Sequence, residues 1–382
     1  MQSKLPDVGI TIFSVMSKLA AEYQAINLSQ GFPDYPISSQ LIEAVHSAML
    51  AGHNQYAPMP GYPALREALS QKVEKLYAYE PDPETEITIT PGATYGIYTA
   101  FTTLLHPGDE AIVLEPAYDS YIPNIISLGA KPVCVPLRYP DYSVDWNAVK
   151  MAISDKTKVI IINSPHNPTG YVWTREDMLC LQEILRDTNI YVISDEVYEH
   201  LTFDGAVHES VLKYPELYAR SFVVFSFGKV FHATGWKMGY TLAPEPLMKE
   251  FRKIHQFLSF TCNTPMQVAL AEHLKDADAY LSLPNFFEAK RDLFLEGMQS
   301  LPFTIHKATR GSYFQLVGYE QISDLPDKEF AVWLTKEYGV ATIPVSAFNH
   351  QGKDDKLIRF CFAKKKETIL AAMDRLAALG KR

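Results

Sequence analysis

Short apolar runs alternate with helical patterns over residues 86–226, and this alternation is the feature that most limits the fold. The apolar runs predict strands at residues 86–90, 110–115, 131–136, 157–163, 190–194 and 222–226. The segments between them predict helices at residues 93–105, 118–128, 145–153 and 174–188, the last with Thr174 as N-cap and Asp177 three positions on. Strands that are apolar throughout are typical of a mostly parallel sheet covered on both faces. The sequence therefore predicts an α/β fold.

The pattern changes on either side of this region. Towards the N-terminus, helical patterns occur at residues 13–22, 39–51 and from residue 63 onward. Towards the C-terminus, one long helix is predicted over residues 265–297, with a break near Pro284. An α+β pattern follows, with strands at residues 304–306, 312–316 and 357–361 and helices at residues 327–338 and 366–379. We therefore predict an N-terminal segment (residues 1–40) that joins a small C-terminal domain (residues 281–382), and a large domain between them (residues 41–280).

Charge and cysteine content exclude several classes of function. The chain has 35 basic and 44 acidic residues, a formal charge of −9, which disfavours nucleic acid or an anionic membrane as the main partner. The four cysteines lie far apart without a CxxC pair, which indicates reduced thiols and not zinc ligands. No run of about 18 apolar residues occurs, and the first residues lack the apolar core of a signal peptide. We expect a soluble, cytoplasmic protein without a metal site.

The stretch Ser221–Tyr240 (SFVVFSFGKVFHATGWKMGY) carries the first chemical signal. Its apolar run predicts a buried strand that ends at Ser226, and Lys229 follows shortly after. A lysine in this place lies at the carboxyl edge of the sheet, where open α/β folds bind ligands. In apolar surroundings and near a second cation, for which Lys237 is the candidate, its amine becomes a nucleophile for carbonyls. Taken alone, most lysines in such a position are surface lysines.

Three further polar features follow predicted strands and so fall on the same edge. Pro91-Gly92-Ala93-Thr94 combines a strand end, a glycine turn and a helix start, which together can bind a phosphate. The loop at residues 163–170 (NSPHNPTG) holds Asn167 rigidly between prolines. Asp195 needs a partner such as a protonated ring nitrogen, and Tyr198 lies one helical turn further on. Taken separately, the first two are also compatible with ordinary turns, and Asp195 with an N-cap.

The strings NSPHNPTG, ISDEVY and SFGKVFHATGWKMGY occur in this order. They resemble the signature motifs of the fold-type-I, pyridoxal 5'-phosphate (PLP)-dependent aminotransferases of class I/II. The strings NQYAPMPGYPALREAL, LSQGFPD and IRFCFAKK are similar to the branch that holds the kynurenine/glutamine and methionine aminotransferases. The resemblance covers nearly the whole chain. It implies a large domain with a mostly parallel sheet of the seven-stranded type, a smaller α+β domain, and PLP as cofactor.

The resemblance also implies roles for the residues at the sheet edge. Lys229 is implied to hold the cofactor as a Schiff base and then to move a proton between the substrate Cα and the cofactor. Asp195 is implied to keep the pyridinium nitrogen protonated, and Tyr198 and Asn167 to hydrogen-bond the ring oxygen. The other implied cofactor contacts are Gly92, Ala93, Thr94, Ser226 and Lys237 at the phosphate, Tyr118 and Val197 on the ring faces, and Tyr56 from a neighbouring subunit.

Substrate contacts are implied in the same way. Arg359, in IRFCFAK, is implied to clamp the substrate α-carboxylate through two parallel hydrogen bonds, with help from Gly31 and Asn167. The contribution of Tyr56 implies a homodimer with shared active sites. Many relatives carry arginine where this chain has Lys237, although lysine also occurs in the kynurenine/methionine branch. Lys237 is therefore the rival of Lys229 for the cofactor bond, and the spacing after Ser226 favours Lys229.

The substrate side chain is expected to be neutral. The candidates for its pocket form an aromatic set, each member of which is also compatible with core packing: Phe13, Tyr62, Tyr95 and Phe260. No second arginine lies in a matching motif, which disfavours an acidic substrate. Methionine, an aromatic amino acid, glutamine or kynurenine fits better.

The leading hypothesis is an aminotransferase that moves an amino group from a neutral amino acid to a 2-oxo acid. A β-lyase acting on cysteine conjugates is the alternative, because Lys229 and Asp195 would serve it equally. A PLP-binding regulator without turnover is disfavoured by the acidic charge and by the early start of the pattern. A nucleotide-dependent enzyme is disfavoured because neither GxGxxG nor GxxxxGK[ST] occurs.

Overall fold

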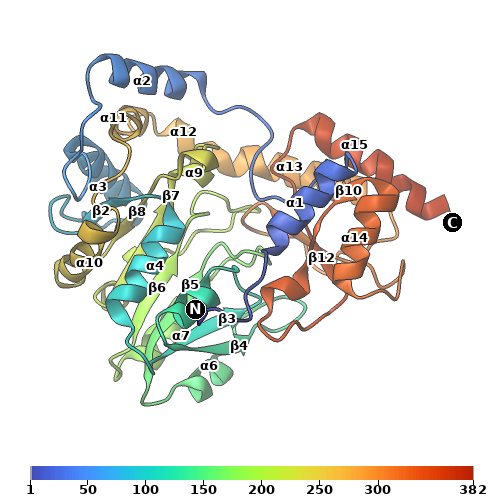
Figure 1. The fold of residues 1–382 in the computed structure, drawn as a ribbon, viewed down its shortest axis with the longest axis horizontal. Coiled ribbons are helices and arrows are strands. Elements are labelled where there is room, and N and C mark those ends of the chain that lie inside the picture. The colour runs from blue at the N-terminus through green and yellow to red at the C-terminus, as the bar shows by residue number, and fades with distance from the viewer. Residues whose placement is uncertain (1, 382) are drawn as a thin grey trace.

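The computed structural model describes residues 2–381, and a seven-stranded sheet forms the centre of its larger lobe (Figure 1). In spatial order the strands are β2 (Ile87–Thr90), β8 (Gly239–Leu242), β7 (Ser221–Ser226), β6 (Tyr191–Asp195), β5 (Thr157–Asn163), β3 (Glu110–Glu115) and β4 (Lys131–Pro136). Neighbours pair in parallel, except that β8 is antiparallel to both β2 and β7. The predicted mostly parallel sheet is confirmed.

Helices cover both faces of this sheet, because successive strand residues point to opposite sides. On one face, Val113 and Ile161 belong to a core that includes residues of α4 (Ala93–Leu104), α5 (Tyr121–Ser127) and α10 (Glu245–Leu258). On the other face, Ile160 and Val223 share a core with residues of α6 (Trp146–Ala152), α7 (Arg175–Leu185) and α8 (Pro215–Tyr218). The predicted cap of α7 is a capping box, in which Thr174 and Asp177 exchange side chain to backbone hydrogen bonds.

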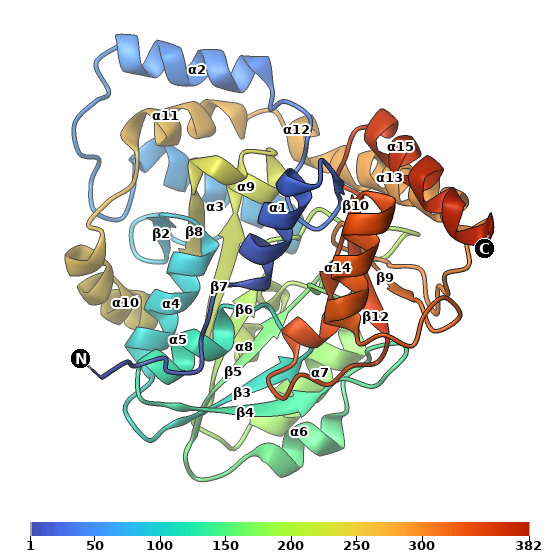
Figure 2. The ribbon, with the colours of Figure 1, turned by 45° about the vertical axis from the view of Figure 1, so that its right-hand side comes forward.

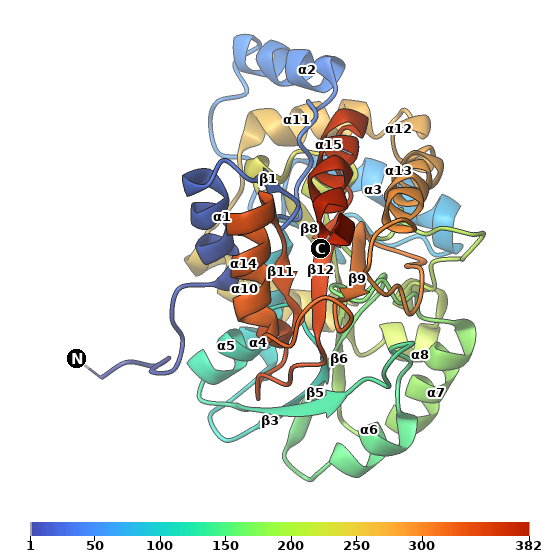
Figure 3. The same ribbon diagram turned by 90° about the vertical axis from the view of Figure 1, so that its right-hand side faces the viewer.

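The C-terminal lobe holds a smaller antiparallel sheet in the order β11 (Ile343–Pro344), β12 (Leu357–Cys361) and β9 (Phe314–Gly318). Its main helices are α13 (Leu283–Met298), α14 (Asp327–Tyr338) and α15 (Lys366–Leu376). The N-terminal helix α1 (Ile12–Glu22) packs beside α14, and β1 (Ile26–Asn27) pairs with β10 (Val340–Ala341) (Figures 1 and 3). The N-terminal segment therefore lies on this lobe, while the domain boundaries stay a prediction.

Five further helices and four short 3-10 turns complete the described residues. They are α2 (Ser39–Leu50), α3 (Pro63–Tyr77), α9 (Phe227–Val230), α11 (Thr264–His273) and α12 (Asp278–Leu281), with short 3-10 turns at η1 (Val211–Lys213), η2 (Thr234–Trp236), η3 (Val345–Phe348) and η4 (Ala377–Lys381). Helix α2 lies along α11 at the outside of the molecule (Figure 2). Within residues 2–381, no helix has the length and apolar character needed to span a bilayer.

Several predicted elements differ from the structure. The single long helix predicted over residues 265–297 is wrong, because the chain forms α11, α12 and α13 separately. The predicted break near Pro284 is confirmed at Ser282, between α12 and α13, and Pro284 lies in the first turn of α13, where proline is tolerated. The strand predicted at residues 304–306 is also wrong, since Thr304 makes only an isolated bridge with Gly318. The strand predicted at residues 312–316 begins later, at Phe314, and the last helix ends at Leu376.

Candidate active site

A cavity of about 340 Å³ lies where β5, β6 and β7 end, and all three parts of the chain contribute to its wall. The N-terminal segment supplies Phe13 and Gly31, and β12 of the C-terminal lobe supplies Arg359. The other predicted site residues in the wall come from the large sheet and its loops: Gly92, Ala93, Thr94, Tyr118, Asn167, Asp195, Val197, Tyr198, Ser226, Lys229 and Lys237. Most residues that the sequence assigned to one site are therefore brought together.

Lys229 lies on the short helix α9, just beyond the end of β7. Its Nζ atom donates hydrogen bonds to the carbonyl oxygen of Gly31 at 2.9 Å and to the hydroxyl of Tyr313 at 2.8 Å. Burial lowers the pKa of Lys229 to about 8, and the nearby Arg359 cation acts in the same direction. A substantial share of the amine is therefore neutral near pH 8, which is the form that attacks carbonyl carbon.

Asp195 is the last residue of β6 and is buried. Its carboxylate accepts a hydrogen bond from the hydroxyl of Tyr121 at 2.5 Å and one from the N–H of Val197 at 3.3 Å. Burial raises the pKa of Asp195 to about 6, with those hydrogen bonds and Lys229 acting against it. A buried carboxylate at a cavity wall is suited to a cationic N–H group of a ligand.

Arg359 is fully buried in the middle of β12. One Nη atom donates to Asn167 Oδ1 at 2.7 Å and the other to the carbonyl oxygen of Ser29 at 3.0 Å. Its Nε atom is buried without a hydrogen-bond partner among the described residues. The guanidinium also lies 3.8 Å from the ring centroid of Phe314. Because burial lowers its pKa only to about 10, Arg359 remains charged at neutral pH and can bind an anion.

The N-terminal end of α4 forms another part of the cavity wall. Gly92 has a φ of +83°, which favours glycine, and turns the chain from β2 into α4. A Cβ atom at Gly92 would lie 3.6 Å from Lys237 Nζ, so this ammonium lies next to the helix start. Helix N–H groups, the hydroxyls of Thr94 and Ser226, and the Lys237 ammonium together suit a phosphate group.

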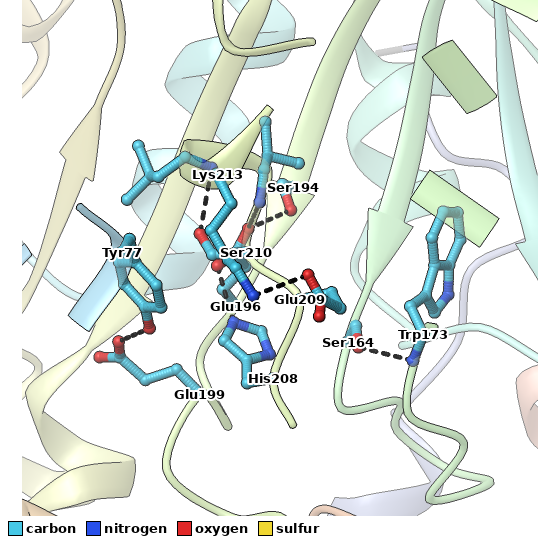
Figure 4. A network of polar contacts seen from close by, with 12 residues as sticks. Tyr77, Ser164, Trp173, Ser194, Glu196, Glu199, His208, Glu209, Ser210 and Lys213 are labelled. Atoms are coloured by element: carbon cyan, nitrogen blue, oxygen red, sulfur yellow. Dashed lines mark hydrogen bonds and ion pairs between the residues drawn. The ribbon is translucent and has the colours of Figure 1, made fainter. Parts of the chain in front are cut away.

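The turn after β6 carries Asp195 and Tyr198 and also two buried acidic residues, Glu196 and Glu199, some of whose polar contacts are drawn in Figure 4. The Glu196 carboxylate interacts with His208 Nε2 and Ser194 Oγ, both at 2.8 Å. The partners of Glu199 are Lys72 Nζ at 2.5 Å, Tyr77 Oη at 2.6 Å and Tyr240 Oη at 3.3 Å. These contacts fix the backbone from which Asp195 and Tyr198 face the cavity.

Four predicted site residues do not line the cavity of this chain. Tyr56 is 82% exposed and packs only against the ring of Phe260, at 5.6 Å between centroids, among the ring contacts of the described residues. The ring of Tyr62 packs against His53, and the Tyr95 hydroxyl lies 2.9 Å from His255 Nδ1. The roles given to these residues stay predictions.

Two tyrosines with direct contacts to the site were missed by the sequence analysis. Tyr121, which binds Asp195, lies three residues beyond Tyr118 in EPAYDSY, but no spacing links it to a carboxylate 74 positions later. Tyr313, which binds Lys229, comes from the segment before β9 in the other lobe. Both contacts depend on tertiary structure, and no local pattern indicates them.

The donor and acceptor groups of the cavity fit PLP. An amine with a lowered pKa lies beside Asp195, whose buried carboxylate matches the protonated nitrogen of a pyridine ring. The phosphate-binding groups lie at the start of α4, and Arg359 has an unused buried N–H for the carboxylate of a substrate.

Comparisons with known proteins agree with this chemistry. Residues 23–376 match the family described as aminotransferase class I and II. The chain is 48% identical over 379 residues to methionine aminotransferase of Escherichia coli, covering 99% of this chain and 98% of that protein. It is 34% identical to kynurenine–oxoglutarate transaminase 1 of Rattus norvegicus, covering 98% and 96%.

Solved structures show the same relationship. The crystal structure of Escherichia coli YbdL, identified there as a methionine aminotransferase, superposes with a TM-score of 0.97 at 47% identity and covers 99% of both chains. A Thermus thermophilus aspartate aminotransferase superposes with a TM-score of 0.89 at 28% identity over 99% of both chains. The chain therefore belongs to the class I and II aminotransferases and is a PLP-dependent aminotransferase.

Proposed function

We propose that the enzyme transfers the amino group of a neutral amino acid, such as methionine, an aromatic amino acid, glutamine or kynurenine, to a 2-oxo acid. The observation that carries this proposal is the surroundings of Arg359. Arg359 is the one arginine among the described residues that line the cavity. The aromatic rings of Phe13, Phe314 and Phe348 lie near its guanidinium. One buried cation accounts for one carboxylate, and the rings favour an apolar side chain beside it.

The relatives support the same substrate class. The relative at 48% identity is named for methionine, and the more distant ones at 34% to 37% identity include enzymes named for kynurenine. These names come from other proteins, and here they support the proposal together with the single clamping arginine.

We further propose how the residues of the cavity divide the chemistry. When bound, PLP supplies an electron sink for charge that develops at the substrate Cα. Lys229 Nζ would hold the cofactor covalently and, when free, would accept the proton from the substrate Cα. The Asp195 carboxylate would stabilise the proton on the ring nitrogen, and the Tyr198 hydroxyl would donate to the ring oxygen. Asn167 binds the same ring oxygen and, with Gly31, the substrate carboxylate that Arg359 clamps.

The remaining contacts position the cofactor. Gly92, Ala93, Thr94, Ser226 and Lys237 would hold the phosphate, while Tyr118 and Val197 would pack against the ring. Tyr118 and Val197 both line the cavity, which supports this arrangement.

We propose a homodimer with shared active sites. Tyr56 is largely exposed and lies outside its own cavity, together with Phe260, which is 40% exposed. A tyrosine with this exposure is available to the phosphate site of a second subunit, and Tyr62, Tyr95 and Phe260 would join the side-chain pocket from the same region.

We also propose the domain division at residues 40 and 280, and a cytoplasmic location, which the four free cysteines support.

The substrate class is tested with a panel of amino donors and one 2-oxo acid acceptor. We expect kcat/KM for methionine or an aromatic donor to exceed that for aspartate by a factor of about 100 or more, because a second carboxylate would be buried without a partner. A preference for aspartate would overturn the proposal. Release of pyruvate and ammonia from a cysteine conjugate without any acceptor would identify β-lyase activity.

A further inference from the structure

Tyr313 reaches the cavity region from the C-terminal lobe, and hydrogen bonds hold the backbone just before it in place. The preceding residue, Ser312, is buried and has a φ of +61°, a conformation that side-chain-bearing residues rarely adopt. Its N–H donates to the carbonyl of Leu201 at 2.9 Å, and the N–H of Phe203 donates to the carbonyl of Arg310 at 2.8 Å. The lobe is thus tied to the large domain just where Tyr313 enters.

Three polar atoms from distant parts of the chain meet at the end of Tyr313. Its hydroxyl donates to the carbonyl oxygen of Gly31 and lies 2.8 Å from Lys229 Nζ, which also contacts the Gly31 oxygen at 2.9 Å. Because the hydroxyl proton is used by Gly31, the lone pairs of the hydroxyl oxygen accept an N–H from Lys229. The two oxygens contact each other and therefore lie on the same side of the nitrogen, which leaves its other side to the cavity.

Aromatic rings complete the surroundings of the amine. Lys229 Nζ lies 5.4 Å from the ring centroid of Tyr313 and 5.6 Å from that of Tyr198. The two rings pack edge to face at 5.1 Å between centroids. The Tyr313 ring is fully buried, so both the ring and its hydroxyl have one defined position.

We propose that Tyr313 is a positioning residue, which holds the Lys229 amine together with the Gly31 carbonyl whenever that amine is not bonded to the cofactor. The proposal rests on the assignment of Lys229 made under the proposed function. During turnover the lysine must release the cofactor, keep its nitrogen near the substrate Cα and return. The Tyr313 hydroxyl and the Gly31 carbonyl hold one side of the nitrogen, so its other side faces the cavity. The amine is then already oriented for reaction with the substrate Cα.

The variant Tyr313→Phe tests this proposal because it keeps the ring and removes only the hydroxyl. Tyr319→Phe is the matched control, since Tyr319 is also fully buried in the C-terminal lobe and its hydroxyl donates to Leu325, away from the cavity. Borohydride reduction and peptide mapping of the PLP-loaded enzyme come first. An adduct on a lysine other than Lys229 would remove the proposed function itself, independently of Tyr313.

The first readout is the pH profile of Lys229 acetylation by acetic anhydride in the cofactor-free protein, followed by peptide mass. Loss of one acceptor for the ammonium lowers the midpoint by about one pH unit in Tyr313→Phe. Tyr319→Phe leaves it unchanged. Apart from the Tyr313 hydroxyl itself, the charged and titratable groups around the amine are the same in both variants, namely Asp195, Tyr198, Lys237, Arg359 and Cys361.

The second readout is the rate at which the PLP-loaded enzyme changes to its pyridoxamine phosphate form. It is measured at saturating amino donor in the absence of an oxo acid. We expect a loss of about tenfold to a hundredfold in Tyr313→Phe, with the dissociation constants of donor and cofactor unchanged because their own contacts remain. Tyr319→Phe behaves as wild type. If an adduct on Lys229 is found but either readout of Tyr313→Phe stays at the wild-type value, the role of Tyr313 is overturned.

Discussion

At the scale of single residues, the two lysines of the cavity differ in what surrounds them. Lys229 contacts Gly31 and Tyr313, and burial lowers its pKa to about 8, whereas Lys237 lies beside the turn at Gly92. We expect Lys229→Ala to abolish transamination and cofactor trapping by borohydride. Lys237→Ala should mainly weaken cofactor retention, measured by equilibrium dialysis. A trapped adduct at Lys237 in the Lys229→Ala enzyme would contradict the assignment.

Asp195 makes the cofactor-free protein sensitive to pH. Burial raises its pKa from 3.8 to about 6, so between these values the folded chain binds more protons than the unfolded chain. Stability therefore falls as pH rises from about 4 to 6, by up to ~3 kcal/mol for this group.

Replacement of Asp195 by asparagine removes the unfavourable free energy of burying an ionised carboxylate. We expect cofactor-free Asp195→Asn to have a higher thermal midpoint than the wild type at pH 7, and the gap to close near pH 4. The same variant should bind PLP more weakly, because the partner of the ring nitrogen is lost. An equal gap at both pH values would show that the buried charge is not its cause.

The sequence predicted the residues whose chemistry is tied to a strand end or a motif. Asp195 ends a strand, Asn167 and Lys229 lie within four residues of one, and the motifs placed Arg359 with them in one cavity. Tyr121 and Tyr313 could not be predicted, because their hydroxyls reach the site through packing between segments 74 and 84 positions apart.

At the scale of elements, the turn after β6 depends on a buried ion pair. Lys72 on α3 and Glu199 are both almost fully buried, and although burial alone would raise the pKa of Glu199, Lys72 and His200 hold it well below its usual range. Removing one partner leaves the other charge uncompensated. We expect Glu199→Gln to destabilise the enzyme by about 3–5 kcal/mol in denaturant unfolding.

The matched control is Glu272→Gln, which breaks the exposed pair of Glu272 and Lys275. Its cost should be below about 1 kcal/mol. The double variant Lys72→Met/Glu199→Gln should recover much of the loss, because no unpaired charge remains. A loss for Glu199→Gln as small as that of the control would contradict a structural role for the pair.

Element prediction succeeded best for strands of five to seven residues. The strands β3, β4, β5 and β12 occur at the predicted bounds. The two-residue strands β1, β10 and β11 were not predicted, since such short segments become strands only by pairing with a distant partner. The segment at residues 304–306 has strand-like composition but lacks a partner along its length.

At the scale of the whole molecule, the site is incomplete in a single chain if Tyr56 serves a neighbour. A mixed dimer of Tyr56→Phe and Lys229→Ala chains would contain one intact site, with Lys229 from one chain and Tyr56 from the other. We expect the mixed dimer to be more active than either parent homodimer, up to half of wild type. Full activity of a dilute monomer, measured with its mass by light scattering, would refute shared sites.

The central claim is that Lys229 and PLP carry out transamination of a neutral amino acid. The most direct test is the absorbance spectrum of the purified enzyme before and after addition of methionine without any oxo acid. We predict a yellow cofactor band that converts to the band of pyridoxamine phosphate and returns on addition of a 2-oxo acid. A protein that stays colourless after incubation with PLP would contradict the account.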